Sequence, residues 1–171
     1  LLYAFANLFG PGVLPYQIMA LVFAAAGGAM IYRIGIRFAG KFASLVAGCL
    51  YILALSAFGA AIGQSEVFYM PLAIGMAALT IKSFEHDDVS KIIRMSILAM
   101  LLGGIMLQIK YSVAPQCAFF GIVLLWRLRS LEVLTVKVIG LGILFAGIGM
   151  TPTLLVAGAY LYMGHFDAFF F

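Results

Sequence analysis

Residues 14–32 read LPYQIMALVFAAAGGAMIY, and residues 33–41 then read RIGIRFAGK. The first stretch has no charged residue and is about as long as a bilayer-spanning helix, for which roughly 20 residues are needed. Arg33, Arg37 and Lys41 place three cations in the turn that follows. Turns rich in Lys and Arg stay on the cytoplasmic side of a membrane. This stretch therefore predicts a membrane helix that ends at the cytoplasmic face.

The same alternation of apolar run and polar turn continues along the chain. Six apolar runs predict spanning helices at residues 14–32, 42–62, 66–83, 91–109, 112–126 and 133–162. Pro152 lies inside the last run and predicts a kink there. The expected fold class is therefore all-α, a polytopic transmembrane bundle of about six helices that forms one domain over residues 1–171.

The first twelve residues, LLYAFANLFGPG, are apolar at helical spacing but too short to span a bilayer. They predict a short helix lying at the outer interface, stopped by the Gly-Pro-Gly sequence. The alternative is the end of a truncated spanning helix. The chain starts at Leu1 without Met, so we expect it to be an internal segment of a longer protein.

The composition excludes two broad classes of protein. The chain is 65% hydrophobic and only 9% charged, whereas soluble domains carry about 25% charged residues. Its pI near 9.2 does not indicate nucleic-acid binding, because the basic residues flank apolar runs and form no continuous patch. Cys49 and Cys117 lie in apolar runs near opposite membrane faces, so no disulfide is expected.

The basic residues set the predicted orientation. Nine of the ten fall in alternate gaps between the apolar runs, and Lys110 alone falls in the other set. Six spans with these gaps inside the cell place both ends of the chain outside. The external gaps then hold few charges, and candidate site residues were sought among them.

Glu66 follows Gln64 and Ser65 and opens the third apolar run on the predicted external side. A carboxylate there is favoured by the helix dipole, and Ser65 would cap the helix, so capping alone explains this residue. The functional alternative is a ligand for a metal or a group that orients a substrate. The two interpretations carry equal weight on physical grounds.

Lys110 ends the fourth apolar run and is followed by Tyr111. One interpretation is a lysine at a helix C-terminus whose ammonium group reaches the membrane interface. The other is a phosphate site, since Lys binds phosphate as a point charge. The isolation of Lys110 from the nine internal cations favours the phosphate.

The remaining polar residues predict no site. His165 and Asp167 are expected to be ordinary loop residues. Residues 85–88, EHDD, are expected to form a solvated cytoplasmic loop rather than a metal cluster. No catalytic triad, phosphate-binding loop or zinc motif occurs.

Four stretches resemble the GT-C membrane glycosyltransferases, the group that includes protein O-mannosyltransferases and the lipid A aminoarabinose transferase. They are the basic joint of residues 32–48, Gln64-Ser65-Glu66 at a helix start, the Gly-rich helix 103–111 ending in Lys110-Tyr111, and residues 164–169, GHFDAF. The resemblance extends over essentially the whole chain and rests on short motifs.

The resemblance implies an enzyme of the bacterial inner membrane that moves a sugar from a polyprenyl-phosphate carrier to a glycan, lipid or protein acceptor on the external face. Its partners would be that donor, the acceptor and membrane lipid, and no nucleic acid. The catalytic base of the family precedes the part represented here, and any soluble C-terminal domain would follow it. Lys110 and Tyr111 would bind the lipid phosphate. Glu66 and Gln64 would lie near the acceptor or a divalent metal ion, the one candidate cofactor.

Two other classes remain as alternatives. A transporter would carry charges at the bilayer midplane and internal repeats, and neither is found in the sequence. A structural membrane subunit without activity stays open.

Overall fold

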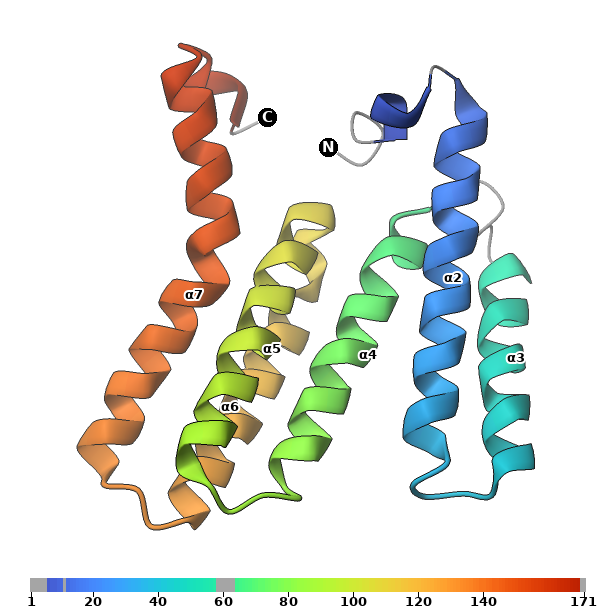
Figure 1. Cartoon of the computed structure of the whole chain (residues 1–171). Coiled ribbons are helices and arrows are strands. Elements are labelled where there is room, and N and C mark those ends of the chain that lie inside the picture. Colours follow the sequence, from blue (N-terminus) through green and yellow to red (C-terminus); the bar gives the residue numbers. More distant parts are fainter. Residues whose placement is uncertain (1–5, 11, 58–63, 170–171) are drawn as a thin grey trace. The chain divides into compact units, whose positions relative to one another are not determined.

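The computed structural model describes residues 6–10, 12–57 and 64–169. These residues form helices and connecting turns, so the all-α prediction is confirmed (Figure 1). The chain divides into two compact units, residues Leu1–Ala78 and Leu79–Phe171. Each unit is described by itself, and the prediction of a single domain stays a prediction.

The first unit is built on the antiparallel pair of α2 (Val13–Gly35) and α3 (Lys41–Ala57) (Figure 1). Glycines allow the two backbones to approach closely: a Cβ added to Gly48 would lie 2.8 Å from the carbonyl oxygen of Gly28. In lipid, where apolar side chains gain little by leaving the solvent, such close packing drives helix association. Gly28 and Gly48 therefore lie at a close helix contact.

α4 (Ser65–Ser83) begins in the first unit and packs through an aromatic side chain. Phe68 is fully buried, with its ring centroid 5.2 Å from that of Tyr16 and 5.4 Å from that of Phe23, both on α2. Aromatic pairs at this separation stabilise a contact beyond the area they bury. Phe68 thus fixes the first turn of α4, where Glu66 also lies.

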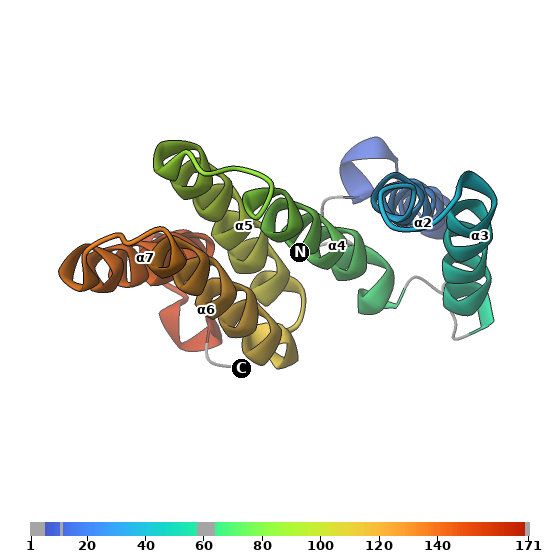
Figure 2. The same ribbon diagram turned by 90° about the horizontal axis from the view of Figure 1, so that it is seen from below.

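The second unit contains the end of α4, α5 (Val89–Ile109), α6 (Ala114–Ser130) and α7 (Thr135–Tyr162). Short 3-10 turns lie at Tyr111–Val113 (η3) and Phe166–Phe169 (η4). The view along the helices in Figure 2 shows α5, α6 and α7 side by side. A Cβ at Gly104 of α5 would clash with the carbonyl oxygen of Gly149 and lie 2.9 Å from Cδ of Pro152, so α5 and α7 touch backbone to backbone.

The helix ends agree with the sequence predictions to within a few residues, with one clear correction. The fifth predicted helix was placed at residues 112–126, whereas α6 runs from Ala114 to Ser130. Arg127 and Arg129 lie in its last turn. Cations stabilise the C-terminal end of a helix through its dipole, so these charges extend the helix instead of ending it.

Two other predictions concern segments that lie partly outside the described residues. The second helix was predicted to reach residue 62, but residues 58–63 lie outside those described, and α3 is described as 17 residues long. Of the predicted N-terminal helix, the structure describes one 3-10 turn, η1 (Asn7–Phe9). Gly10 and Gly12, with φ of 141° and 112°, follow that turn.

Five of the described helices are long and apolar enough to cross a bilayer, and α3 is shorter. The chain is therefore an integral membrane protein. α7 is continuous through Pro152 and bends part-way along its length, as the kink prediction required (Figure 1). Only 6% of the most apolar 18-residue window of α7 is buried by the described residues, so most of this helix is not covered by them.

Candidate functional site

The candidate site in the first unit lies at the start of α4. The backbone N–H of Val67 donates to the carbonyl of Gln64 at 3.1 Å, so the helix begins directly after Gln64. Ser65 is the first helical residue, and its hydroxyl donates to a carboxylate oxygen of Glu66 at 3.2 Å. Ser65 therefore lies inside the helix rather than before it as the predicted cap. Glu66 lies in the first turn, as predicted, where the helix dipole favours its charge.

A cavity of about 270 Å³ opens beside this turn. Gln64, Glu66 and Tyr69 line it from the α4 side, and Tyr51 lines it from α3. The rest of the lining is apolar. Small-molecule sites are typically apolar cavities with a few convergent polar groups, of about 300–1,000 Å³. The cavity is slightly smaller than that range, and its lining is mainly apolar with a few polar residues among it.

Tyr51 and Tyr69 are cavity residues that the sequence analysis did not single out, and Tyr51 is the more deeply buried at its polar end. Its hydroxyl is buried and has no hydrogen-bond partner among the described residues. It lies against Gly27 of α2, where an added Cβ would be 2.5 Å from the phenolic oxygen. The only available signal was Gly27 in the Ala/Gly-rich part of α2, since a glycine in a membrane helix marks a close neighbour.

Lys110 and Tyr111 lie in the second unit, at the end of α5. Lys110 follows the last helical residue, and its backbone N–H donates to the carbonyl of Met106 at 3.0 Å. The predicted position of Lys110 at a helix end is confirmed. Tyr111 opens η3 and is 85% exposed. Because the two units are described separately, these residues are not placed relative to Glu66.

An apolar groove of about 340 Å³ lies between α5, α6 and α7. Several glycines line it, among them Gly103, Gly121 and Gly149. The Cys117 thiol faces it and lies 3.6 Å from the carbonyl oxygen of Gly103. Both cysteines are free thiols.

A polar contact joins α5 to α7 beside this groove. Gln108 Nε2 donates to Thr153 Oγ1 at 2.6 Å and lies 3.4 Å from the Gly104 carbonyl. Polar side chains that pair across helices in a membrane hold those helices together. This pair was not predicted, because its members are 45 residues apart in the chain.

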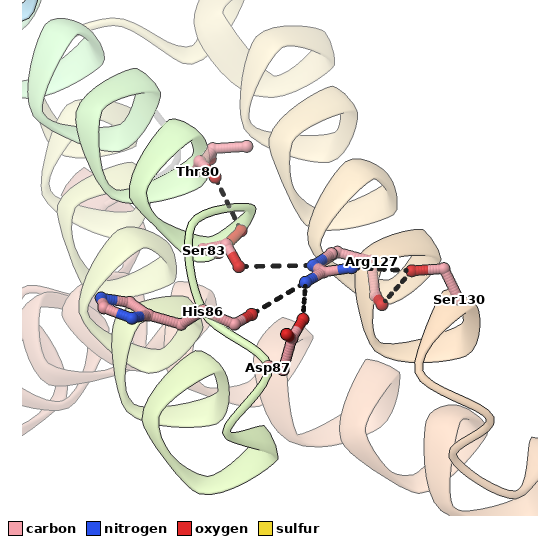
Figure 3. Close-up of polar contacts among 6 residues, drawn as sticks. All are labelled: Thr80, Ser83, His86, Asp87, Arg127 and Ser130. Carbon is pink, nitrogen blue, oxygen red and sulfur yellow. Dashed lines mark hydrogen bonds and ion pairs between the residues drawn. The ribbon is translucent and has the colours of Figure 1, made fainter. Parts of the chain in front are cut away.

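The loop of residues 84–88, predicted to be a solvated loop, makes hydrogen bonds to α6. Arg127 Nη2 donates to the His86 carbonyl and to Asp87 Oδ1, both at 2.8 Å, while its Nε donates to the Ser83 carbonyl at 3.3 Å (Figure 3). Asp88 caps α5 by accepting from the Ser90 N–H at 2.9 Å. The His86 imidazole points away from Arg127. These bonds therefore hold the loop between α4 and α5 against α6.

No group of three or more metal-ligating side chains occurs within residues 6–10, 12–57 and 64–169. A metal at Glu66 stays a prediction. His165 and Asp167 lie at the end of the chain, in and next to η4. Protein-family models, curated proteins and solved structures were all compared with the chain, and none matches.

Proposed function

We propose that the chain is the membrane part of a glycosyltransferase that moves a sugar from a polyprenyl-phosphate carrier to an acceptor at the external face of the membrane. The observation that carries this proposal is the cavity beside α4. Its lining includes the half-buried Glu66 together with Gln64 and the tyrosines Tyr51 and Tyr69. A carboxylate and an amide bind hydroxyl groups, and phenol rings pack against the apolar faces of a sugar.

The chemistry assigned to this cavity is binding and orientation. Glu66 accepts hydrogen bonds from the hydroxyls of the acceptor or of the sugar, and Gln64 adds an amide donor. In this proposal the cavity residues do not stabilise the leaving group. That task belongs to a cation, because the departing polyprenyl phosphate carries negative charge. Lys110 supplies such a cation at a helix end, with Tyr111 next to it.

The test of the cavity replaces Glu66 in the complete protein reconstituted into proteoliposomes. Glu66→Gln should lower sugar transfer from a polyprenyl-phosphate donor by about tenfold or more, the effect of losing a charge-assisted hydrogen bond. Glu132→Gln is the matched control, because Glu132 is an exposed carboxylate in the turn after α6. Equal transfer by both variants and the parent would reduce Glu66 to a residue that only favours the helix start.

The test of the phosphate site replaces Lys110. Lys110→Met should weaken the apparent affinity for the donor by about ten- to a hundredfold, because a charge-assisted contact to phosphate contributes about 1.5–3 kcal/mol. Lys110→Arg should keep part of that affinity, since charge matters more than shape. Lys91→Met serves as the control at the other end of α5. If Lys110→Met binds the donor as tightly as the parent does, Lys110 does not bind the phosphate and only extends its ammonium group to the membrane interface.

A further inference from the structure

The turn between α2 and α3 carries a second surface of defined chemistry, here called the basic turn: Arg33, Arg37, Phe38, Lys41 and Phe42. The side chains of Arg33 and Lys41 are exposed. The two phenyl rings beside them are also exposed, Phe38 to 72% and Phe42 to 79%. Aromatic rings next to cations at the end of a membrane helix are typical of segments that lie in the headgroup region.

The backbone of the basic turn is held in one conformation. The N–H groups of Phe38 and Ala39 both donate to the Gly35 carbonyl, at 2.9 and 2.8 Å. The Ser44 hydroxyl donates to the Gly40 carbonyl at 3.1 Å, and Ser44 is 1% exposed. An ordered turn presents its cations at lower entropic cost than a flexible one does.

The basic turn also differs from the other basic segments in its charge balance. Residues 1–65 contain no Asp or Glu. In the second unit, by contrast, Arg127 is paired with Asp87, and Glu132 lies in the sequence between Arg129 and Lys137. The excess positive charge of the first 65 residues is therefore concentrated in one short turn.

We propose that the basic turn binds the phosphate headgroup of an anionic phospholipid of the surrounding leaflet. Arg33 and Lys41 contact the phosphate, Arg37 adds to the positive potential, and Phe38 and Phe42 insert among the acyl chains below it. Cytoplasmic leaflets are anionic, and each juxtamembrane Lys or Arg near such a surface contributes about 1 kcal/mol, or roughly fivefold in affinity. The occupant is a lipid rather than free phosphate, because the exposed phenyl rings need an apolar environment.

Fluorescence quenching by brominated lipids tests this proposal. The chain has one tryptophan, Trp126, so a reporter is made as Phe38→Trp in a Trp126→Phe background of the complete protein. The protein is placed in phosphatidylcholine bilayers that contain brominated phosphatidylglycerol or brominated phosphatidylcholine. We expect phosphatidylglycerol to quench the reporter with about 25-fold higher apparent affinity at low ionic strength, since two cations contact it and each contributes roughly fivefold. Inorganic phosphate at matched ionic strength should not displace the lipid.

Three variants complete the experiment. Arg33→Gln with Lys41→Gln should remove the preference for phosphatidylglycerol, and Arg33→Lys with Lys41→Arg should keep it. Lys82→Gln with Lys137→Gln removes the same charge from the second unit and should leave the preference unchanged. A second reporter, Phe42→Trp, covers the case in which the first does not fold. Equal quenching by the two lipids, persistence of the preference in the Arg33 and Lys41 variant, or displacement by phosphate would overturn the proposal.

Discussion

Arg127 joins α6 to the loop between α4 and α5 in the second unit. Its guanidinium bonds to two backbone carbonyls and one carboxylate from the segment 83–87, and its central carbon lies 5.5 Å from the centroid of the Phe84 ring. Only arginine offers five donors in one rigid plane. The Arg127 side chain is 13% exposed, and its bonds to the Ser83 and His86 carbonyls are partly buried, whereas the Asp87 carboxylate is 89% exposed.

Replacing Arg127 should therefore destabilise the second unit. Arg127→Met should lower the free energy of unfolding by about 1.5–3 kcal/mol, the range for hydrogen bonds to charged groups, and Arg127→Lys by less. Arg129→Met is the control, because Arg129 is exposed and donates a long hydrogen bond, of 3.3 Å, to the Val133 carbonyl. Unfolding of the purified protein in mixed micelles measures both. Equal effects at the two positions would show that Arg127 is only a membrane-facing charge.

At the residue scale, the sequence predicted positions better than partners. Glu66 at a helix start and Lys110 at a helix end follow from charges at the edges of apolar runs, and both positions are confirmed. The unpartnered Tyr51 hydroxyl and the Arg127–Asp87 pair were not predicted. Both depend on segments distant in sequence that meet in space, and a single sequence carries no direct signal for such contacts.

At the element scale, the contact between α5 and α7 depends on the absence of a side chain. Gly104 lies against the Gly149 carbonyl and the Pro152 ring. The Gln108–Thr153 hydrogen bond lies one helical turn further along the same contact. Because both backbones are rigid there, added volume cannot be absorbed by a rotamer change.

Gly104→Ala should accordingly separate α5 from α7. Overpacking of this kind costs about 1–3 kcal/mol, and the Gln108–Thr153 bond should be lost with it. Gly147→Ala is the matched control, since a Cβ there meets nothing within 4 Å and alanine is the better helix former. Thermal unfolding of the two variants should move in opposite directions. A neutral Gly104→Ala would mean that α5 and α7 are not in close contact in the membrane.

The helices themselves could be predicted because each needs only local information. An apolar run of sufficient length fixes a spanning helix, and polar residues mark its ends. The prediction placed the end of α6 at Trp126 because the following arginines look like a boundary in the sequence. They continue the helix instead, since the last turn of a helix favours cations and Arg127 finds its partners from there.

At the scale of the whole molecule, the number of membrane-spanning helices between two points of the chain decides whether those points lie on the same side of the membrane. α3 is described as 17 residues, the lower limit of about 17–25 for a spanning helix. If α3 spans, an odd number of crossings separates the turn after α2 from the end of the chain. Those two points then lie on opposite sides of the membrane, as the basic residues predict.

Cysteine labelling distinguishes these arrangements. Gly40→Cys and His165→Cys are made separately in a background with Cys49→Ala and Cys117→Ala. An impermeant thiol reagent added to intact cells should label position 165 and leave position 40 unlabelled, and both should react in broken membranes. The reverse pattern would invert the orientation. Equal reactivity in intact cells would mean that one predicted span does not cross.

Lys110 and the three residues of η3 are all that join α5 to α6. A connection of that length leaves the two helices little freedom to enter the bilayer separately during synthesis. We therefore expect α5 and α6 to leave the translocon as a paired hairpin. In the predicted orientation Lys110 crosses the bilayer at the tip of that hairpin, and a lysine at the centre of a spanning helix raises the insertion free energy by about 2.5–3.5 kcal/mol. The apolar surface of two helices, rather than one, offsets that barrier.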